Sequence, residues 1–399
     1  MQTPRSILEQ IRLARAPLAA FAAMGIAWGA YAALVPDTKA MLGASDALFG
    51  SLLLATPLAA VTAMLLAPRV APRIGPHVLS LAVLALALAF TLPGWQSVAP
   101  FFAGAMLLVG LTNGFLDVVM TARVSAIEAE RGLSLMNLNH AAYSFGYAGA
   151  AFATGAARSL GASPGQVLTG ASLALLLLAA ATWERRAGAT GLEVRGRQAG
   201  GGGGIAFWGG LVVLIAFMAE NAAENWSALH IERTLGGSKA LGSSGPAILA
   251  LTMGFGRIVG QLALARVAEG RVIARGAMVA AAGFALAALA PLPAVAYVGL
   301  IIVGLGASVV APTAFTAIGR LASAGNRGRV IARATALGYL GYFFGPPVLG
   351  LTAEFAGLRM AFLGMGGAVL SLVLLVPVLA RAGRRVRPAD DPAAAPSET

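Results

Sequence analysis

Residues 205–229 read IAFWGGLVVLIAFMAENAAENWSAL, an apolar run that two carboxylates interrupt. About 20 such residues cross the hydrocarbon core of a bilayer as a helix. Glu220 and Glu224 are four residues apart, so they share one face of that helix. An acid near the bilayer centre costs about 2.5–3.5 kcal/mol on insertion scales, and it is tolerated where it meets water, a partner charge or a proton path. The stretch therefore predicts a membrane helix that carries a functional site.

The composition of the whole chain extends this prediction. Of its 399 residues 58% are hydrophobic, only 11% are charged, and the mean hydropathy is +0.81. A soluble protein carries about 25% charged residues, so we expect an all-α polytopic membrane protein. The chain has no Cys, which excludes disulfides, thiolate metal sites and a cysteine nucleophile. No Walker A, zinc-binding or Ser-His-Asp pattern is found, so we expect neither an enzyme nor a bound cofactor or metal.

Apolar stretches of spanning length recur along the chain and predict twelve transmembrane helices. The predicted spans are 17–36, 48–68, 77–96, 98–120, 137–158, 165–183, 205–229, 243–266, 271–290, 294–318, 329–354 and 359–381. The polar segment 184–204 ends in five glycines, so we expect a flexible cytoplasmic linker there. It divides the chain into six-helix halves at 1–183 and 205–381, and 382–399 is expected to be a disordered cytoplasmic tail.

The positions of the 28 Lys and Arg residues predict the orientation. Most of them fall at the two termini and in five loops on one side of the predicted membrane. The residues on the other side are Lys39, Arg158, Arg233, Lys239 and Arg359. The positive-inside rule places the basic side and both termini in the cytoplasm. Because this rule also accounts for the net charge of +12, no nucleic-acid partner is expected.

Short motifs recur at an offset of half the chain. Val-Gly-Leu at 109–111 recurs at 303–305, and Gly-Tyr at 146–147 recurs at 341–342, which are offsets of 194 and 195 residues. Each half has six predicted spans, so both halves keep the same orientation in the membrane. The pattern therefore predicts a parallel repeat about an axis along the membrane normal.

Twelve spans, a parallel 6+6 repeat and a central cytoplasmic linker resemble the major facilitator superfamily. The family's loop signature between spans 2 and 3 is partly kept at 69–76, RVAPRIGP, where Arg73 and Gly75 match and Pro72 replaces the acidic residue. The resemblance implies the major facilitator fold in a multi-pass protein of a bacterial inner membrane, surrounded by lipid. We expect it to work as a monomer.

Three further segments are similar to the fucose-permease-like branch of that superfamily. They are NGFLD at 113–117, MNLNH at 136–140 and the region from Glu220 to Trp226. In that branch an acid in span 4 and another in span 1 are implicated in proton coupling and sugar binding. The span 4 acid matches Asp117, while the span 1 position falls near Ala32, where the acid is missing.

Span 4 and span 5 carry the first candidate site residues. Asn113 and Asp117 share a helix face, and Asp117 is a candidate proton carrier. The alternative for Asp117 is an interfacial acid close to Arg123. His140 and Tyr143 belong to a polar and aromatic stripe that could bind substrate or relay protons. The alternative for His140 is a core histidine that holds Asp117 or Asn113 across a helix contact.

Glu220 and Glu224 are the strongest candidates for proton coupling, and Asn221 lies beside them as a candidate substrate ligand. Arg257 lies well inside a predicted span, so we expect it to be the charge partner of Glu220 or Glu224. The alternative is an ion pair that only holds spans 7 and 8 together. The proton-coupling and structural interpretations are both true if protonation of the glutamate breaks the ion pair.

Aromatic side chains complete the predicted substrate site. Stacking on a substrate such as a sugar ring is expected from Trp28, Tyr31, Trp226, Tyr339 and Tyr342. For each of them the alternative is ordinary packing or a place in the interfacial aromatic belt.

The leading hypothesis is a secondary transporter that binds a small molecule and protons and works by alternating access. A proton symporter of a sugar-like or other polar solute is preferred. The alternatives are proton-driven efflux of drugs or metabolites, and a membrane sensor that binds a ligand without transporting it.

Overall fold

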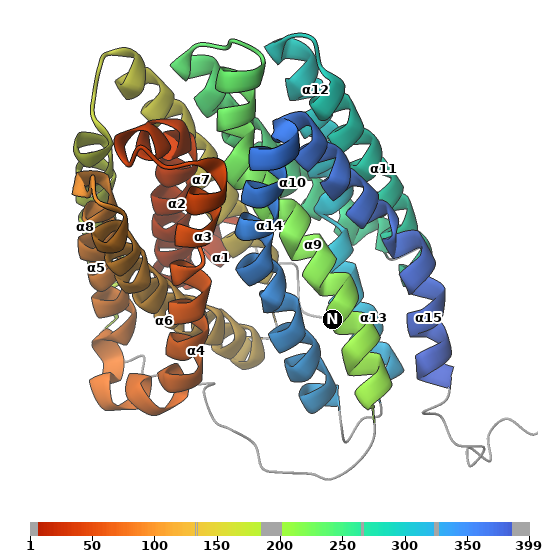
Figure 1. Cartoon of the computed structure of the whole chain (residues 1–399). Helices are drawn as coiled ribbons and strands as arrows, with labels where there is room; N and C mark the ends of the chain where they lie inside the picture. The colour runs from red at the N-terminus through yellow and green to blue at the C-terminus, as the bar shows by residue number, and fades with distance from the viewer. Residues whose placement is uncertain are drawn as a thin grey trace, which may run out of the picture.

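The computed structural model describes residues 7–131, 133, 135–184, 202–264, 267–322 and 327–384, and Figure 1 shows their helices arranged side by side in two groups. The first group contains α1 (Ile7–Leu13), α2 (Arg15–Met41), α3 (Asp46–Leu52), α4 (Ala55–Ile74), α5 (Val78–Thr91), α6 (Ala99–Arg131), α7 (Met136–Ser159) and α8 (Pro164–Ala181). The second contains α9 (Gly203–Leu229), α10 (Lys239–Leu264), α11 (Glu269–Leu289), α12 (Pro293–Ala307), α13 (Val310–Leu321), α14 (Arg327–Leu370) and α15 (Leu372–Arg384).

These helices form the twelve predicted spans. α3 with α4 makes the second span, and α12 with α13 makes the tenth. The stretch assigned to α14 contains a turn at Gly357, where φ is +82°, so it holds the eleventh span and the start of the twelfth. Eight stretches of the described residues are long and apolar enough to cross a membrane. Two of these stretches, Asp46–Trp95 and Arg329–Arg384, each hold two spans, which makes ten. The helices α7 and α10 complete the twelve.

The two halves repeat the same packing. In each half the first span packs extensively against the fifth, as α2 against α7 and α9 against α14, and the second packs against the fourth. Close approach depends on glycine, which lacks a Cβ. A Cβ on Gly29 of α2 would lie 2.0 Å from the carbonyl oxygen of Tyr147, and one on Gly341 of α14 would lie 2.2 Å from that of Leu214. The predicted parallel repeat is therefore confirmed in the packing.

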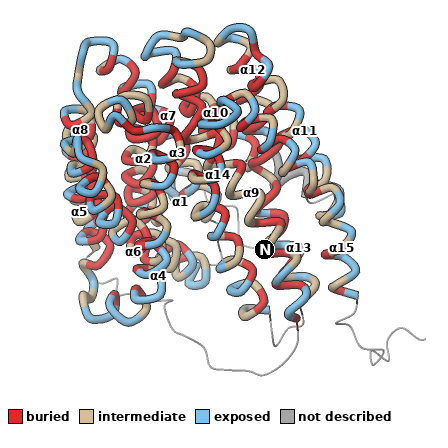
Figure 2. Tube along the Cα trace, viewed as in Figure 1, coloured by how far each residue is buried: buried red, intermediate tan, exposed pale blue. Residues whose placement is uncertain are grey.

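Large apolar side chains cover the outside of the bundle, where Figure 2 shows many exposed positions on the outward faces of the helices. Examples are Leu177, Leu374 and Phe101, which are 77%, 74% and 68% exposed. An apolar surface of this kind is stable in lipid and unstable in water. The arrangement is that of a membrane-embedded bundle.

The linker and tail predictions fall almost entirely outside the described residues. Only Glu184 and Gly202–Gly204 of the predicted linker are described, and only 382–384 of the predicted tail. The domain division therefore stays a prediction.

Candidate functional site

A cavity of about 680 Å³ lies between the two halves. Its walls come from α2, α4, α6 and α7 on one side and from α9, α10, α13 and α14 on the other. All but one of the predicted site residues line it, namely Trp28, Tyr31, Asn113, Asp117, His140, Tyr143, Glu220, Asn221, Glu224, Arg257, Tyr339 and Tyr342. A volume of this size fits a small-molecule site, for which about 300–1,000 Å³ is usual.

Trp28 and Asn113 form a fixed polar corner of the first wall. The indole Nε1 of Trp28 donates a hydrogen bond of 2.8 Å to Oδ1 of Asn113. The Trp28 ring also meets Tyr31 and Phe90 edge-on, with ring centroids 5.8 and 5.3 Å apart. Packing on two sides therefore leaves the indole little freedom.

Asp117 joins the two halves inside the cavity. The Tyr339 hydroxyl donates a hydrogen bond of 3.2 Å to Oδ2 of Asp117, from α14 across to α6. Arg123, expected as an alternative partner for Asp117, instead binds Glu184 with two hydrogen bonds of 2.9 and 2.8 Å. The carboxylate thus has a neutral donor as partner and no cation within hydrogen-bond distance among the described residues.

The two acids of α9 have different surroundings. Nη2 of Arg257 lies 2.8 Å from Oε1 of Glu220, so the predicted charge partner is in place. Among the described residues no hydrogen bond or ion pair reaches the Glu224 carboxylate. Tyr143 lines the same cavity as Glu224, Glu220, Arg257 and Asp117.

His140 does not hold Asp117 or Asn113. Its ring meets Phe21 edge-on at 5.0 Å, and its side chain is open to the cavity. Two more of the predicted site residues carry a buried polar atom without a hydrogen-bond partner among the described residues, the Tyr31 hydroxyl and Oδ1 of Asn221. Buried polar atoms are nearly always paired, so these groups are available to a bound molecule.

Trp226 is the predicted site residue that does not line the cavity. Its side chain is fully buried and packs edge-on against Phe49, with ring centroids 6.3 Å apart. Each residue of an α-helix turns by about 100°, so Trp226 points away from the face that carries Glu220 and Glu224. The prediction that Trp226 contacts substrate is corrected to a packing role.

Methionines that the sequence did not single out also line the cavity. Five methionines line it, all from the first half: Met24, Met64, Met106, Met120 and Met136. They lie on α2, α4, α6 and α7, and no spacing along the chain connects them. Thr313, also unpredicted, lines the cavity with a buried hydroxyl that has no hydrogen-bond partner in the described part of the chain.

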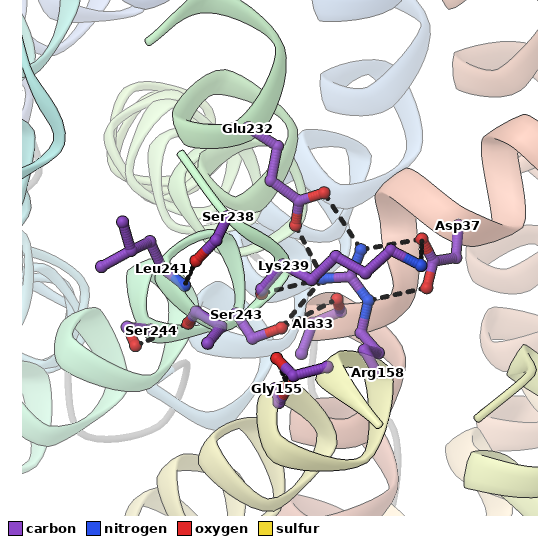
Figure 3. A network of polar contacts seen from close by, with 12 residues as sticks. Ala33, Asp37, Gly155, Arg158, Glu232, Ser238, Lys239, Leu241, Ser243 and Ser244 are labelled. Atoms are coloured by element: carbon purple, nitrogen blue, oxygen red, sulfur yellow. Dashed lines mark hydrogen bonds and ion pairs between the residues drawn. The ribbon is translucent and has the colours of Figure 1, made fainter. Parts of the chain in front are cut away.

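A second cluster of charges closes the end of the bundle that is predicted to face outside. Arg158 of α7 lies fully buried between Asp37 of α2 and Glu232, as Figure 3 shows. Its guanidinium donates to both carboxylates over 2.6–3.1 Å, and also to Oγ of Ser243 at 2.9 Å. Nζ of Lys239 lies 3.6 Å from Asp37. We call Asp37, Arg158, Glu232 and Lys239 the outer charge network.

This network joins the halves because Asp37 and Arg158 belong to the first half and Glu232 and Lys239 to the second. Glu232 lies in a π-helical turn, His230–Thr234, that continues α9. Such turns are rare and are frequent at functional sites. Within the sequence, 74 residues separate Arg158 from Glu232, so no local motif could have revealed the pair.

A smaller contact reinforces the same end. Oε2 of Glu354 on α14 accepts a hydrogen bond of 2.8 Å from the backbone N–H of Asp46, at the first turn of α3. A carboxylate is favourable at a helix N-terminus because unpaired N–H groups point toward it. Figure 1 shows the two halves closer together at this end than at the opposite end. Among the described residues no group of three or more His, Asp or Glu side chains is placed to hold a metal ion.

Comparisons with known proteins agree with this architecture. The family model of the Major Facilitator Superfamily matches residues 18–318 and 209–398. An uncharacterized MFS-type transporter of Yersinia pestis is 29% identical over 92% of this chain and 94% of its own length. In structure the chain is similar to a bacterial homologue of the human lysosomal transporter Spinster, in its inward-facing and occupied conformation, with a TM-score of 0.73, 14% identity and coverage of 97% of this chain and 100% of that one.

A D-xylose–proton symporter also has this fold, with a TM-score of 0.70, 15% identity and coverage of 94% of this chain and 99% of that one. At such identities a structural likeness shows the fold alone. The family model, in contrast, spans both halves of the sequence. The protein therefore belongs to the major facilitator superfamily of membrane transporters.

Proposed function

We propose that the protein is a proton-coupled secondary transporter that moves a small polar solute through the central cavity by alternating access. The observation that carries this proposal is Glu224, a carboxylate that lines the cavity without a hydrogen bond or ion pair among the described residues. A charge of this kind is costly inside a membrane, and protonation removes the cost. Proton binding at Glu224 would therefore be linked to the position of the two halves.

The contacts between the halves support an inward-open state. The outer charge network and the Glu354 contact hold one end closed. The predicted orientation assigns this end to the outside of the cell. Opening to the outside requires that Arg158 part from a carboxylate of the opposite half, which would exchange one arrangement of charges for another.

Asp117 is the second proposed proton site. Its bond to Tyr339 crosses between the halves, so it breaks when α6 and α14 separate. Glu220, predicted as a third, is already paired with Arg257 within the second half. We therefore assign Glu220 and Arg257 to holding α9 against α10, and proton coupling to Glu224 and Asp117.

The substrate class and its direction are part of the proposal. Cavity hydroxyls, amides and aromatic rings favour a hydroxylated solute such as a sugar, and the likeness to the fucose-permease-like branch points the same way. Import by symport is the preferred direction. The five cavity methionines favour the alternative of efflux, because flexible thioether side chains accommodate varied apolar molecules.

Purified protein in liposomes that contain a pH-sensitive dye tests this function. D-Xylose, D-glucosamine and adenosine are offered in turn, with an inward proton gradient for uptake and the reverse gradient for efflux. We expect at least one of them to be accumulated with proton movement. Glu224→Gln should lower gradient-driven accumulation about tenfold or more while exchange without a gradient remains.

Glu130→Gln is the matched control, because Glu130 is an exposed acid on α6 that does not line the cavity. It removes the same charge and should transport like the wild type. Accumulation that ignores the gradient, or that survives Glu224→Gln unchanged, contradicts the proposal.

A further inference from the structure

The charges that line the cavity do not balance. They are the carboxylates of Asp117, Glu220 and Glu224 and the guanidinium of Arg257. Arg257 forms its ion pair with Glu220 at 2.8 Å, and among the described residues neither Asp117 nor Glu224 forms an ion pair, so three carboxylates share one cation. In surroundings of low dielectric each of them gains from a bound cation. If one of Asp117 and Glu224 is protonated, the other carboxylate remains charged and can bind a positive group of the ligand.

Aromatic rings surround the same carboxylates. Phe217 stacks on Tyr342 with ring centroids 4.7 Å apart and meets Tyr339 edge-on at 5.8 Å. Tyr339 in turn donates to Asp117. Tyr143 and Glu224, from opposite halves, line the same cavity. The faces of such rings attract ammonium groups, and a carboxylate beside them adds a direct charge partner.

Unpaired hydroxyl groups and an amide oxygen supply a second, independent feature. Tyr31 is 1% exposed and Thr313 is 0% exposed, and both line the cavity with hydroxyls that find no hydrogen-bond partner among the residues that the structure describes. Within the same described residues, Oδ1 of Asn221 is also buried without a hydrogen-bond partner. A buried polar atom without a partner costs free energy that a ligand hydroxyl or amine recovers. The ligand therefore carries hydrogen-bonding groups besides its charge.

Five methionines of the first half line the same cavity and are available to the rest of the ligand. Asp117 belongs to this half as well, whereas Glu220, Glu224 and Arg257 belong to the second. Thioethers adapt to a ring or a short apolar body of varied shape. The cavity thus combines apolar thioethers in the first half with carboxylates in both halves, Asp117 in the first and Glu220 and Glu224 in the second.

Resting on the proposed function of this site, we propose that its ligand is an organic cation, a protonated or quaternary amine on a hydroxylated, ring-sized body. The positive charge lies between Asp117 and Glu224 and against the rings of Tyr339 and Tyr342. The ligand hydroxyls reach Tyr31, Asn221 and Thr313.

Binding to the purified wild-type protein, measured by calorimetry, tests the charge directly with three matched pairs. They are glucosamine and glucose, choline and its neutral carbon isostere, and tetraphenylphosphonium and tetraphenylborate. Charge-assisted contacts in a buried site favour the cation about tenfold or more, and we expect this preference in at least the first two pairs. Asp117→Asn and Glu224→Gln should each reduce it, and Glu130→Gln should retain it.

Equal affinity within each pair, a preference for the neutral or anionic member, or binding of no cation overturns the proposal. These results are obtained on the wild type, so they do not depend on whether a variant folds. If protons move only together with a neutral solute, the proposed transport function is supported and the proposal of a cationic ligand fails. Cation binding without proton movement would retain the cation site and remove proton coupling.

Discussion

The outer charge network and the cavity are built from the same residue types and differ in how completely these are paired. Arg158 donates to Asp37, Glu232 and Ser243, and its side chain has no exposed surface. In the cavity, Arg257 donates a hydrogen bond to Glu220 and is 22% exposed, and among the described residues no hydrogen bond or ion pair reaches Glu224.

The completeness of pairing distinguishes a structural contact between the halves from a ligand-binding site. A buried guanidinium whose donors are satisfied has nothing left to offer a solute, and removing it takes a bidentate partner from both carboxylates, although Asp37 keeps Lys239 at 3.6 Å. A partly open cavity with unpaired acceptors retains polar groups for a ligand or a proton. Charge within a membrane protein therefore indicates function, and its degree of pairing indicates which function.

The largest effect is expected from Arg158→Leu. Breaking a buried ion pair costs about 3–5 kcal/mol, so the closed outer end should lose that much relative to the open one. The chain has no Cys, so Met64→Cys in the cavity gives a single labelling site. We expect faster labelling by an impermeant thiol reagent from outside and a lower melting temperature.

Arg158→Lys is the control for that experiment. It keeps the charge and loses the fork that binds two carboxylates at once, so its effect should be intermediate. If Arg158→Leu labels and melts like the wild type, the outer charge network does not fasten the two halves.

A smaller effect is expected at the Arg257–Glu220 pair, which is partly exposed. Arg257→Gln leaves a third cavity carboxylate unpaired and should lower stability by about 1.5–3 kcal/mol. Adding Glu220→Gln removes that carboxylate and should restore most of the loss. Thermal unfolding of the two single variants and the double variant completes the cycle. Additive effects would show that the pair does not hold α9 against α10.

The smallest effects compare two tryptophans, of which one lines the cavity. Trp28→Phe removes the hydrogen bond to Asn113 and should weaken glucosamine binding by about fivefold, since one such bond contributes about 1 kcal/mol. Trp226→Phe changes packing against Phe49 and should leave the affinity for glucosamine unchanged. A larger loss of affinity in Trp226→Phe than in Trp28→Phe would contradict the corrected place of Trp226.

Much of the site could be predicted because polar residues are rare in membrane spans and therefore conspicuous. Asp117, Glu220, Glu224 and Arg257 each interrupt an apolar run, and all four line the cavity. Spacing along one helix also placed Asn113 with Asp117 and Glu220 with Glu224, because residues four apart share a face.

The cavity methionines and the outer charge network could not be predicted in the same way. Met24 and Met136 look like ordinary apolar residues in the sequence, and only the assembled helices bring them to the same cavity. Arg158 and Glu232 stand at span ends, where charges are common and carry no signal. Trp226 shows the reverse error, since a polar neighbourhood in sequence does not fix the direction of a side chain.

The sequence by itself determined the membrane class, the twelve spans, the repeat and the buried acids, because hydrophobic length and periodicity are local properties. Only the tertiary structure decided which charges meet. It joined Asp117 to Tyr339 and Arg158 to Glu232 across the halves, and it left Glu224 without a partner among the described residues. These outcomes depend on how helices far apart in sequence pack, and packing is set by many weak contacts at once.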